Sequence, residues 1–212
     1  MTATEFVFTA KEKKDTAEIL KRFSEQDEEE YIFEDYSGLD FSGCLFVGLN
    51  LHYSQFRRTL FVGSTLRKST IKGASFRNSN MERCCLDKCI INEADFSKAK
   101  MNGASLAGVR GRSGLANTKK WKFVGFLPVI FREADLTNAD FTEAYLQGAD
   151  FRNAILDGAD FCETELTGAD FTGAQLNSTN FAGAFMENAR FDASSKNKLT
   201  LSQEQTEVIE FV

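Results

Sequence analysis

Residues 131–191 read FREADLTNAD FTEAYLQGAD FRNAILDGAD FCETELTGAD FTGAQLNSTN FAGAFMENAR F. Every fifth residue of this stretch is large and apolar, and Phe and Leu alternate at these centre positions, with Met186 as the one substitute. A small residue, usually Ala, lies two positions before the centre, and Asp or Asn often lies directly before it. The repeating unit is therefore A-[D/N]-[F/L]-x-x.

The same five-residue spacing of large apolar residues, in the same register, is found in an earlier stretch, from Phe41 to Leu106. All 27 centre positions of the two stretches are large and apolar. Of the 15 glycines, 12 lie three residues before a centre, where a tight turn that favours positive φ is expected. The other three, Gly111, Gly114 and Gly125, lie where the pattern fails. The glycines therefore support the repeat independently of the apolar residues.

A period of five fits neither an α-helix nor an alternating strand, but it fits a short extended segment followed by a turn. The centre and the small residue are two apart, so both face inward, and four such sides close a coil of about 20 residues stacked at about 4.8 Å. Stacked side chains then fill the interior and leave no room for a ligand cavity. The predicted core includes Phe141, Phe151, Phe161, Phe171, Phe181, Leu136, Leu146, Leu156 and Leu166.

The segments Ala149-Asp150-Phe151-Arg152-Asn153 and Ala169-Asp170-Phe171-Thr172-Gly173 closely match the motif. This motif resembles the pentapeptide-repeat family, and the resemblance covers residues 39–193 apart from one insert. It implies an all-β solenoid, a right-handed quadrilateral β-helix, and the number of repeats gives about seven coils.

Both ends are expected to carry caps, because an open stack of strands would aggregate. Residues 1–38 form the predicted N-terminal capping segment, with a capping box at 9–12 and a helix over about 10–25. Residues 194–212 form the predicted C-terminal cap, where Ser202 and Gln205 fit a second capping box before an apolar last turn. Some gyrase-targeting members of the family dimerise through this segment, so the resemblance also implies a homodimer.

The insert is residues 109–129, which hold the only Trp and the only Pro, five basic residues and no acidic residue. The step from Leu106 to Phe131 is 25 residues, which is one repeat of 5 plus 20. The additional 20 residues form either an excursion from the solenoid or a distorted full coil, and in both cases Phe131 would lie on the side of the coil that directly follows the side of Leu106. As a projecting loop, the insert would bind a partner. As a distorted coil, it would place Trp121 and Phe126 in the core. The candidate binding residues are Arg110, Arg112, Lys119, Lys120, Trp121, Lys122, Phe123 and Phe126.

Charge divides the chain along its length. Residues 41–106 carry a net charge of +6 and residues 107–130 of +5, whereas residues 131–192 carry −9. Such a division can steer a complementary partner, although the outer positions of any solenoid must be polar.

Catalytic, metal and cofactor chemistry is not expected. Cys84 and Cys89 occupy inward positions, Cys85 points outward, and the single histidine, His52, lies far from them. No nucleophile and base can be paired, so we expect neither an enzyme nor a small-molecule substrate. No apolar run is long enough for a membrane span and no signal peptide is evident, so a cytoplasmic location is expected.

The sequence favours a non-catalytic scaffold that binds a protein partner through its rigid surface and the 109–129 loop. The family resemblance implies an alternative: a modulator of DNA gyrase or topoisomerase IV that mimics DNA and protects against quinolones or toxins. The basic coils at 41–106 depart from such mimicry. A weaker alternative is direct nucleic-acid binding through the insert and through Arg57, Arg58, Arg67, Lys68 and Lys72.

Overall fold

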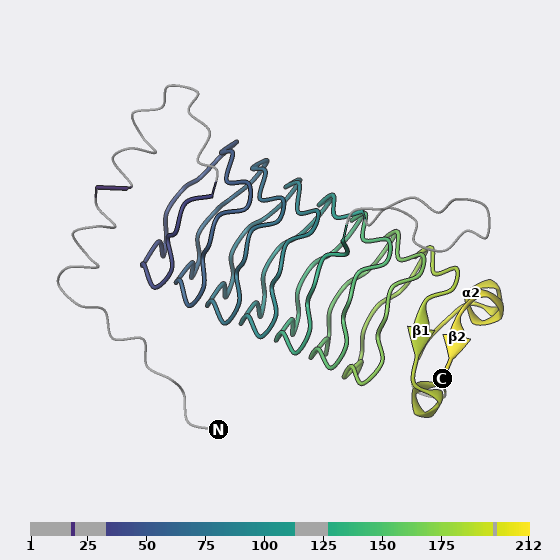
Figure 1. The fold of residues 1–212 in the computed structure, drawn as a ribbon. Coiled ribbons are helices and arrows are strands. Elements are labelled where there is room, and N and C mark those ends of the chain that lie inside the picture. The colour runs from purple at the N-terminus through teal and green to yellow at the C-terminus, as the bar shows by residue number, and fades with distance from the viewer. Residues whose placement is uncertain (1–17, 20–32, 113–126, 197–198) are drawn as a thin grey trace, which may run out of the picture.

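The computed structural model describes residues 18–19, 33–112, 127–196 and 199–212. Within these ranges the chain winds into a stack of four-sided coils (Figure 1). The residue before each centre forms a parallel β-bridge with the residue 20 positions along the chain, as in Asp150↔Asp170 and Ile155↔Gln175. Because such a bridge recurs every five residues, each coil has four sides, and the four-sided solenoid expected from the repeat is present.

The hydrogen bonds of one repeat explain why the unit has five residues. The N–H groups of Phe151 and Asn153 donate to the next coil, at 2.8 and 3.0 Å, and the N–H of Ile155 donates to the previous coil at 2.9 Å. The N–H of Ala154 closes the turn on the carbonyl of Phe151 at 3.0 Å. The remaining N–H, that of Arg152, donates to Oδ1 of Asp150 at 3.2 Å. The Asp or Asn before the centre therefore satisfies the one donor that the backbone leaves open.

The corner after each centre needs a left-handed backbone. All 12 glycines that the sequence places at this turn have positive φ, and so do non-glycine residues such as Asn153, at 58°. This conformation costs a residue with a Cβ about 1–2 kcal/mol, which explains why glycine recurs at the corners.

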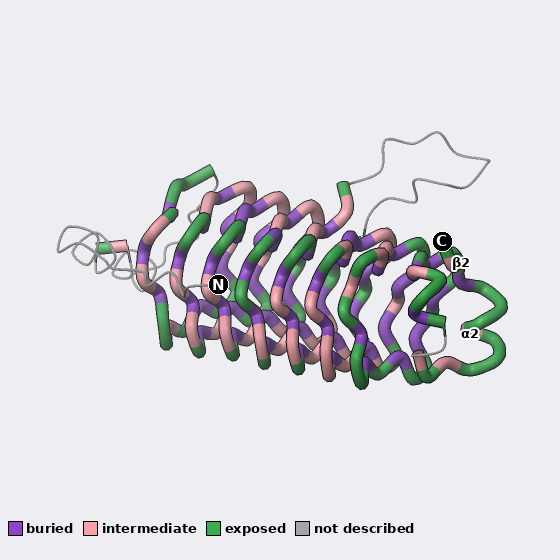
Figure 2. Tube along the Cα trace, turned by 90° about the horizontal axis from the view of Figure 1, so that it is seen from below, coloured by how far each residue is buried: buried purple, intermediate pink, exposed green. Residues whose placement is uncertain are grey.

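Each face of the solenoid is named here after one of its centre residues: the Leu136, Phe141, Leu146 and Phe151 faces. The core residues predicted from the sequence are all fully buried, and Figure 2 shows the alternation of buried and exposed positions along every coil. Phe141 stacks on Phe161 at 4.7 Å, and Phe151 stacks on Phe171 at 4.9 Å. The longest aromatic column belongs to the Phe151 face and comprises Tyr36, Phe56, Phe76, Phe96, Phe131, Phe151, Phe171 and Phe191.

The insert is shorter than the sequence indicated. Ile130 pairs with Asp95, where a step of 20 residues would place residue 115, so 15 residues are inserted. The coils on either side bond directly to each other, as in Arg110↔Tyr145, and no further coil lies between them. Both 20-residue alternatives were therefore wrong. The sides still follow one another in order, but Gly111 occupies the side after Leu106, so Phe131 lies on the side after that. Phe131 continues the face of Phe96, one side away from the one expected.

Gly111 is the residue that led to this error. It is buried at a centre position, and its N–H donates to the carbonyl of Tyr145 at 2.7 Å, but it has no apolar side chain to reveal its role. A Cβ at Gly111 would lie 2.5 Å from Val129, which fills the space instead. Val109 and Val129 are both fully buried, so the limits of 109–129 given to the insert were too wide.

The ladder also extends beyond residues 39–193, the range predicted from the repeats. It begins at Asp35, with Tyr36 buried at a centre position. At the other end, strand β1 (Arg190–Phe191) pairs in parallel with strand β2 (Glu210–Phe211). The 3-10 helix η1 (Ala193–Ser195) follows β1.

Helix α2 (Gln203–Val208) lies next to the last coil, and the capping box of Ser202 and Gln205 is present. The amide of Gln205 also donates to the carbonyls of Phe181 and Ala184, at 2.7 and 3.0 Å. The predicted N-terminal helix lies outside the described residues except for Glu18 and Ile19, which are helical, and Ile19 packs against the core. In the part of the chain that the structure describes, no helix is long and apolar enough to cross a membrane.

Candidate functional site

The chemistry of this molecule lies on its outer faces, because stacked side chains occupy the interior. On each face, the residues before and after the centre point outward and repeat once per coil. Side chains from coils far apart in the sequence therefore form columns. The candidate sites are columns and their ends, not a cleft.

Two of the predicted loop residues are described. Arg110 and Arg112 are both exposed on the Leu146 face, where the chain leaves the solenoid. The guanidinium of Arg112 lies over the ring of Tyr145, 4.9 Å from its centroid, and its carbonyl accepts a 2.7 Å hydrogen bond from Asn92. The other predicted loop residues lie outside the described ranges: Lys119, Lys120, Trp121, Lys122, Phe123 and Phe126.

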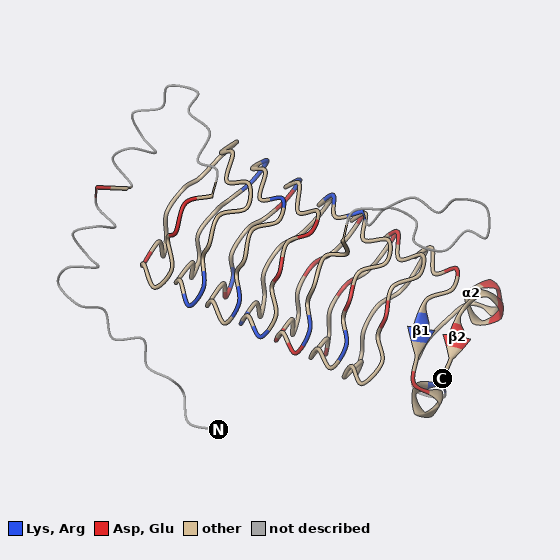
Figure 3. Ribbon diagram, viewed as in Figure 1, with Lys and Arg blue, Asp and Glu red and all other residues tan. Residues whose placement is uncertain are grey.

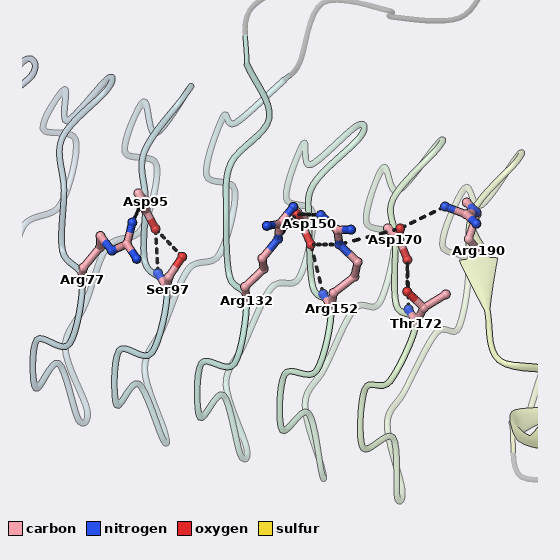
Figure 4. A network of polar contacts seen from close by, with 9 residues as sticks. All are labelled: Arg77, Asp95, Ser97, Arg132, Asp150, Arg152, Asp170, Thr172 and Arg190. Carbon is pink, nitrogen blue, oxygen red and sulfur yellow. Dashed lines mark hydrogen bonds and ion pairs between the residues drawn. The ribbon is translucent and has the colours of Figure 1, made fainter.

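A ladder of arginine and aspartate runs along the outside of the Phe151 face (Figure 4). Arg132 and Arg152 both contact Asp150, and the contacts from Arg152 are 2.8 and 2.9 Å long. Arg190 lies 3.2 Å from Asp170. The ladder was not predicted, because its contacts between coils join residues 18 or 20 positions apart in the sequence, which meet only once the coil length is known.

Asp150 is the most buried charged group of this ladder, at 6% exposure. Desolvation raises the pKa of its carboxyl, whereas the hydrogen bond and the charge of Arg132 lower it. The net direction is upward, so the arginines do not fully offset the cost of burial. The negative charge of this face is thus largely paired within the protein.

The Phe141 face carries acidic side chains of a different kind. Asp140 and Asp160 are one coil apart, and each accepts the N–H two residues later, at 2.8 and 2.9 Å. Glu143 and Glu163 are exposed at the corners of the same two repeats. Among the described residues, none of these four carboxylates forms an ion pair. We call these four residues the acidic strip.

Exposed apolar residues recur on the Leu146 face, where Arg110 and Glu165 alternate with them along the column. Ile90, Tyr145 and Phe185 all occupy its outward column, and Phe185 is 61% exposed. Sequence reasoning missed this column, because the assignment of faces after the insert was off by one side.

Two of the five cysteines, Cys84 and Cys89, are core packing residues. Cys84 and Cys89 are fully buried, and desolvation raises the pKa of Cys84 well above its ordinary value and that of Cys89 to about 12. The thiol of Cys89 donates to the carbonyl of Leu66 at 2.8 Å. No group of three or more potential metal ligands occurs within the described ranges.

The charge division seen in the sequence is preserved in space. Figure 3 shows Lys and Arg concentrated at the corners of the N-terminal and middle coils, and Asp and Glu more frequent in the coils toward β1. The two halves of the solenoid therefore present different charge to a partner.

Comparison with known proteins gives a family match. Residues 54–92, 129–158 and 154–192 match the family model of pentapeptide repeats, in 8 copies. No curated protein sequence gives a significant match. The family's fold is the right-handed quadrilateral β-helix, in agreement with the four-sided coils described above.

Several solved structures are similar. HetL, a protein involved in heterocyst differentiation regulation in the cyanobacterium Nostoc, is 18% identical; the match covers 80% of this chain and 96% of HetL, with a TM-score of 0.33. QnrB1, a plasmid-mediated fluoroquinolone resistance protein, is 17% identical, with coverage of 82% and 93% and a TM-score of 0.41. A protein of the Arabidopsis thaliana thylakoid lumen is 19% identical, with coverage of 90% and 83% and a TM-score of 0.20. At these values the likenesses carry no argument about function.

Proposed function

Because the chain is a pentapeptide-repeat protein, we propose that it acts without catalysis, as a rigid scaffold that binds a protein partner through its outer faces and its insert. The observation that carries this proposal is the filled interior. Centre residues such as Phe151, Phe161 and Leu166 have no exposed surface, so the core leaves no space for a substrate. A partner would meet only the outward columns.

The insert supports binding because it departs from the solenoid without interrupting the stack. The ladder closes across it between Asp95 and Ile130, so the fold does not need residues of the insert to bridge the two halves. Arg110 and Arg112 stand exposed at its start, and its basic and aromatic composition is typical of binding hot spots. We propose that this segment makes part of the contact with the partner.

We propose a capping role for both ends of the solenoid. The residues before Asp35, where the ladder begins, would cap the N-terminal end, and residues 194–212 would cap the C-terminal end and contribute to a homodimer. The partial burial of Ile19 and the contacts of Gln205 support the capping roles. Exposed Val208 and Val212 support a further contact at the C-terminal end.

The register of the ladder gives a clean variant for testing the role of the insert. Removal of residues 114–128 takes out 15 residues and joins Ser113 to Val129, which restores an unbroken run of pentapeptides. Ser113 would then occupy a corner position, and Ser178 already holds such a corner at a φ of 57°. We call this the loop-deleted variant.

The experiment is affinity capture with quantitative mass spectrometry, comparing the full chain with the loop-deleted variant. A partner enriched by the full chain and lost from the loop-deleted variant, then reproduced with the two purified proteins, is the expected result. Identical sets of captured proteins, with the deleted variant folded by circular dichroism, would show that the insert is not the binding element.

A second candidate is a modulator of DNA gyrase or topoisomerase IV, and the acidic strip on the Phe141 face favours it. Asp140 and Asp160 are stacked one coil apart with unpaired charge, as a mimic of a phosphate backbone requires. The Phe151 face fits this function less well, because Asp150 and Asp170 are paired with arginines.

A supercoiling assay with and without a quinolone tests this candidate. The variant Asp140→Asn with Asp160→Asn removes charge but keeps the turn, since Asn180 already makes the same bond to Ala182 at 3.0 Å. Asp135→Asn on the Leu136 face is the matched control. Modulation of gyrase that the double variant loses and the control keeps supports the candidate. An unchanged supercoiling reaction at micromolar protein removes it.

A further inference from the structure

An open depression lies on the outside of the solenoid near its N-terminal end. It is lined by residues at or next to the corners of three successive coils on the Phe151 face: Ser37, Gly38, Arg57, Arg58, Arg77 and Asn78. Three arginines thus line one hollow, and none of its lining residues in the described part of the chain is acidic. Along the rest of this face, by contrast, Arg132 and Arg152 share the carboxylate of Asp150.

Within the described part of the chain, most of the hydrogen-bond donors of these three arginines have no acceptor. Arg57 makes one long side-chain contact, from Nε to Oγ of Ser75 at 3.5 Å. Arg77 makes one contact with Asp95 at 3.4 Å. Arg58 forms no ion pair within the described ranges. Each guanidinium carries several N–H donors, so the hollow has an excess of donors and positive charge.

Among the described residues, the acidic groups near the depression offset its positive charge only in part, since Asp95 pairs with Arg77 and with neither of the other two arginines. Asp35 precedes Ser37 on the same face, and its Oδ1 accepts the N–H of Ser37 at 2.9 Å. Hydrogen bonds from Ser37, and then the charge of Arg57, lower the pKa of this carboxyl. Asp35 is therefore held by its own turn, and the guanidinium of Arg57 keeps its donors for another acceptor.

We propose that this depression binds a compact phosphate-bearing anion. Arg57 and Arg77 occupy the same column one coil apart, and coils are spaced at about 4.8 Å, so both guanidinium groups can reach one phosphate group between them. Planar guanidinium groups bind phosphate oxygens through paired charge-assisted hydrogen bonds. Arg58 and the side-chain amide of Asn78 supply further donors at the rim.

The small extent of the depression favours a compact ligand over a nucleic-acid strand. Its lining spans only the first three described coils. Farther along the same face, Asp95, Asp150 and Asp170 recur beside the arginines, and a phosphate backbone following the column would meet them. An inorganic polyphosphate or the phosphate chain of a nucleotide has the matching size and charge.

The test is isothermal titration calorimetry of the full chain with sodium tripolyphosphate at low ionic strength. We expect saturable binding at one site, weakened about tenfold by Arg58→Gln. Arg83→Gln is the matched control, because Arg83 is also an exposed corner residue with positive φ, 54° against 57° for Arg58, but lies on the Leu136 face. We expect this control to bind as the unaltered chain does.

Two results would overturn the proposal. Absence of binding at low salt would show that the depression is not an anion site. Equal weakening of tripolyphosphate binding by Arg58→Gln and Arg83→Gln would show that only the diffuse positive charge of the surface acts. A parallel titration with a 20-base-pair DNA duplex separates the source of the phosphate. If the duplex binds more tightly than tripolyphosphate, and if Arg58→Gln and Arg83→Gln weaken its binding equally, the basic surface is a nucleic-acid surface and not a site for a compact anion.

Discussion

Replacement of Phe151 by Leu tests how much the stacked aromatic column contributes to stability. Phe151 is fully buried and lies between Phe131 and Phe171, with ring centroids 4.9 Å away on both sides and interplanar angles of 5° and 3°. Phe141 and Phe161 meet it edge-on, at 5.8 and 5.4 Å. The substitution keeps an apolar side chain but removes all four ring contacts.

The expected loss follows from these contacts. An aromatic pair contributes about 0.5–1.5 kcal/mol beyond the burial of area, and four contacts of one ring are not fully additive. We therefore expect Phe151→Leu to lower the free energy of unfolding by about 2–4 kcal/mol. Phe46→Leu is the matched control, because the contacts of Phe46 with aromatic rings of the described residues are two edge contacts, at 5.5 and 6.3 Å, and Leu66 already follows it on that face. Its expected loss is about 1 kcal/mol.

Urea denaturation followed by far-ultraviolet circular dichroism measures both variants. The midpoint should fall more for Phe151→Leu, with the dependence on denaturant unchanged if the coils still unfold together. Equal losses for the two variants would refute the idea that the parallel column stabilises the stack beyond ordinary apolar burial. So would a loss below about 1 kcal/mol for Phe151→Leu.

Three further outcomes are expected. Arg132→Gln should lower the melting temperature at pH 7, because it leaves the buried carboxylate of Asp150 with less compensation. Burial already raises the pKa of Asp150, so the folded state takes up a proton more readily than the unfolded state as the pH falls. The loss of melting temperature caused by Arg132→Gln should therefore shrink toward pH 4 in thermal scans. A loss that stays constant with pH would contradict this account. Gln205→Ala should destabilise the protein more than Ser202→Ala, because loss of the Gln205 amide also leaves two carbonyls of the last coil without their donor. The Ser202→Ala change is expected to cost about 1 kcal/mol. Urea denaturation midpoints compare the two variants. Removal of residues 114–128 should leave the thermal midpoint within a few degrees of the unaltered chain, whereas a collapse of the midpoint would mean that the insert supports the stack.

The local repeat could be predicted from the sequence because one pentapeptide carries its own explanation. The apolar centre fills the core, glycine suits the corner, and the Asp before the centre accepts the N–H that the backbone leaves open, as Asp150 does for Arg152. The sequence revealed the Asp pattern without its reason, which became clear only from the hydrogen bonds.

The long-range arrangement was harder to predict. The order of faces after the insert depends on one buried residue, Gly111, which has no side chain to identify it as a centre. The same shift hid the apolar column of Ile90, Tyr145 and Phe185. The basic depression was missed for another reason. The sequence pattern indicated only a basic stretch that includes Arg57 and Arg58 but not Arg77, and the 20-residue coil is what brings these three residues to one hollow.

Because each side of a coil is one pentapeptide, the fold has a consequence for how such chains change in evolution. An insertion or deletion of one pentapeptide keeps every apolar residue inside, yet it rotates all later outward side chains by a quarter turn relative to the earlier ones. Here the ladder closes across the 15 inserted residues without such a rotation, so Phe131 continues the aromatic column of Phe96 between halves of opposite charge. A single duplication of five residues would therefore rearrange the outward side chains along the whole rod without a point mutation, and the packing of the core would stay the same.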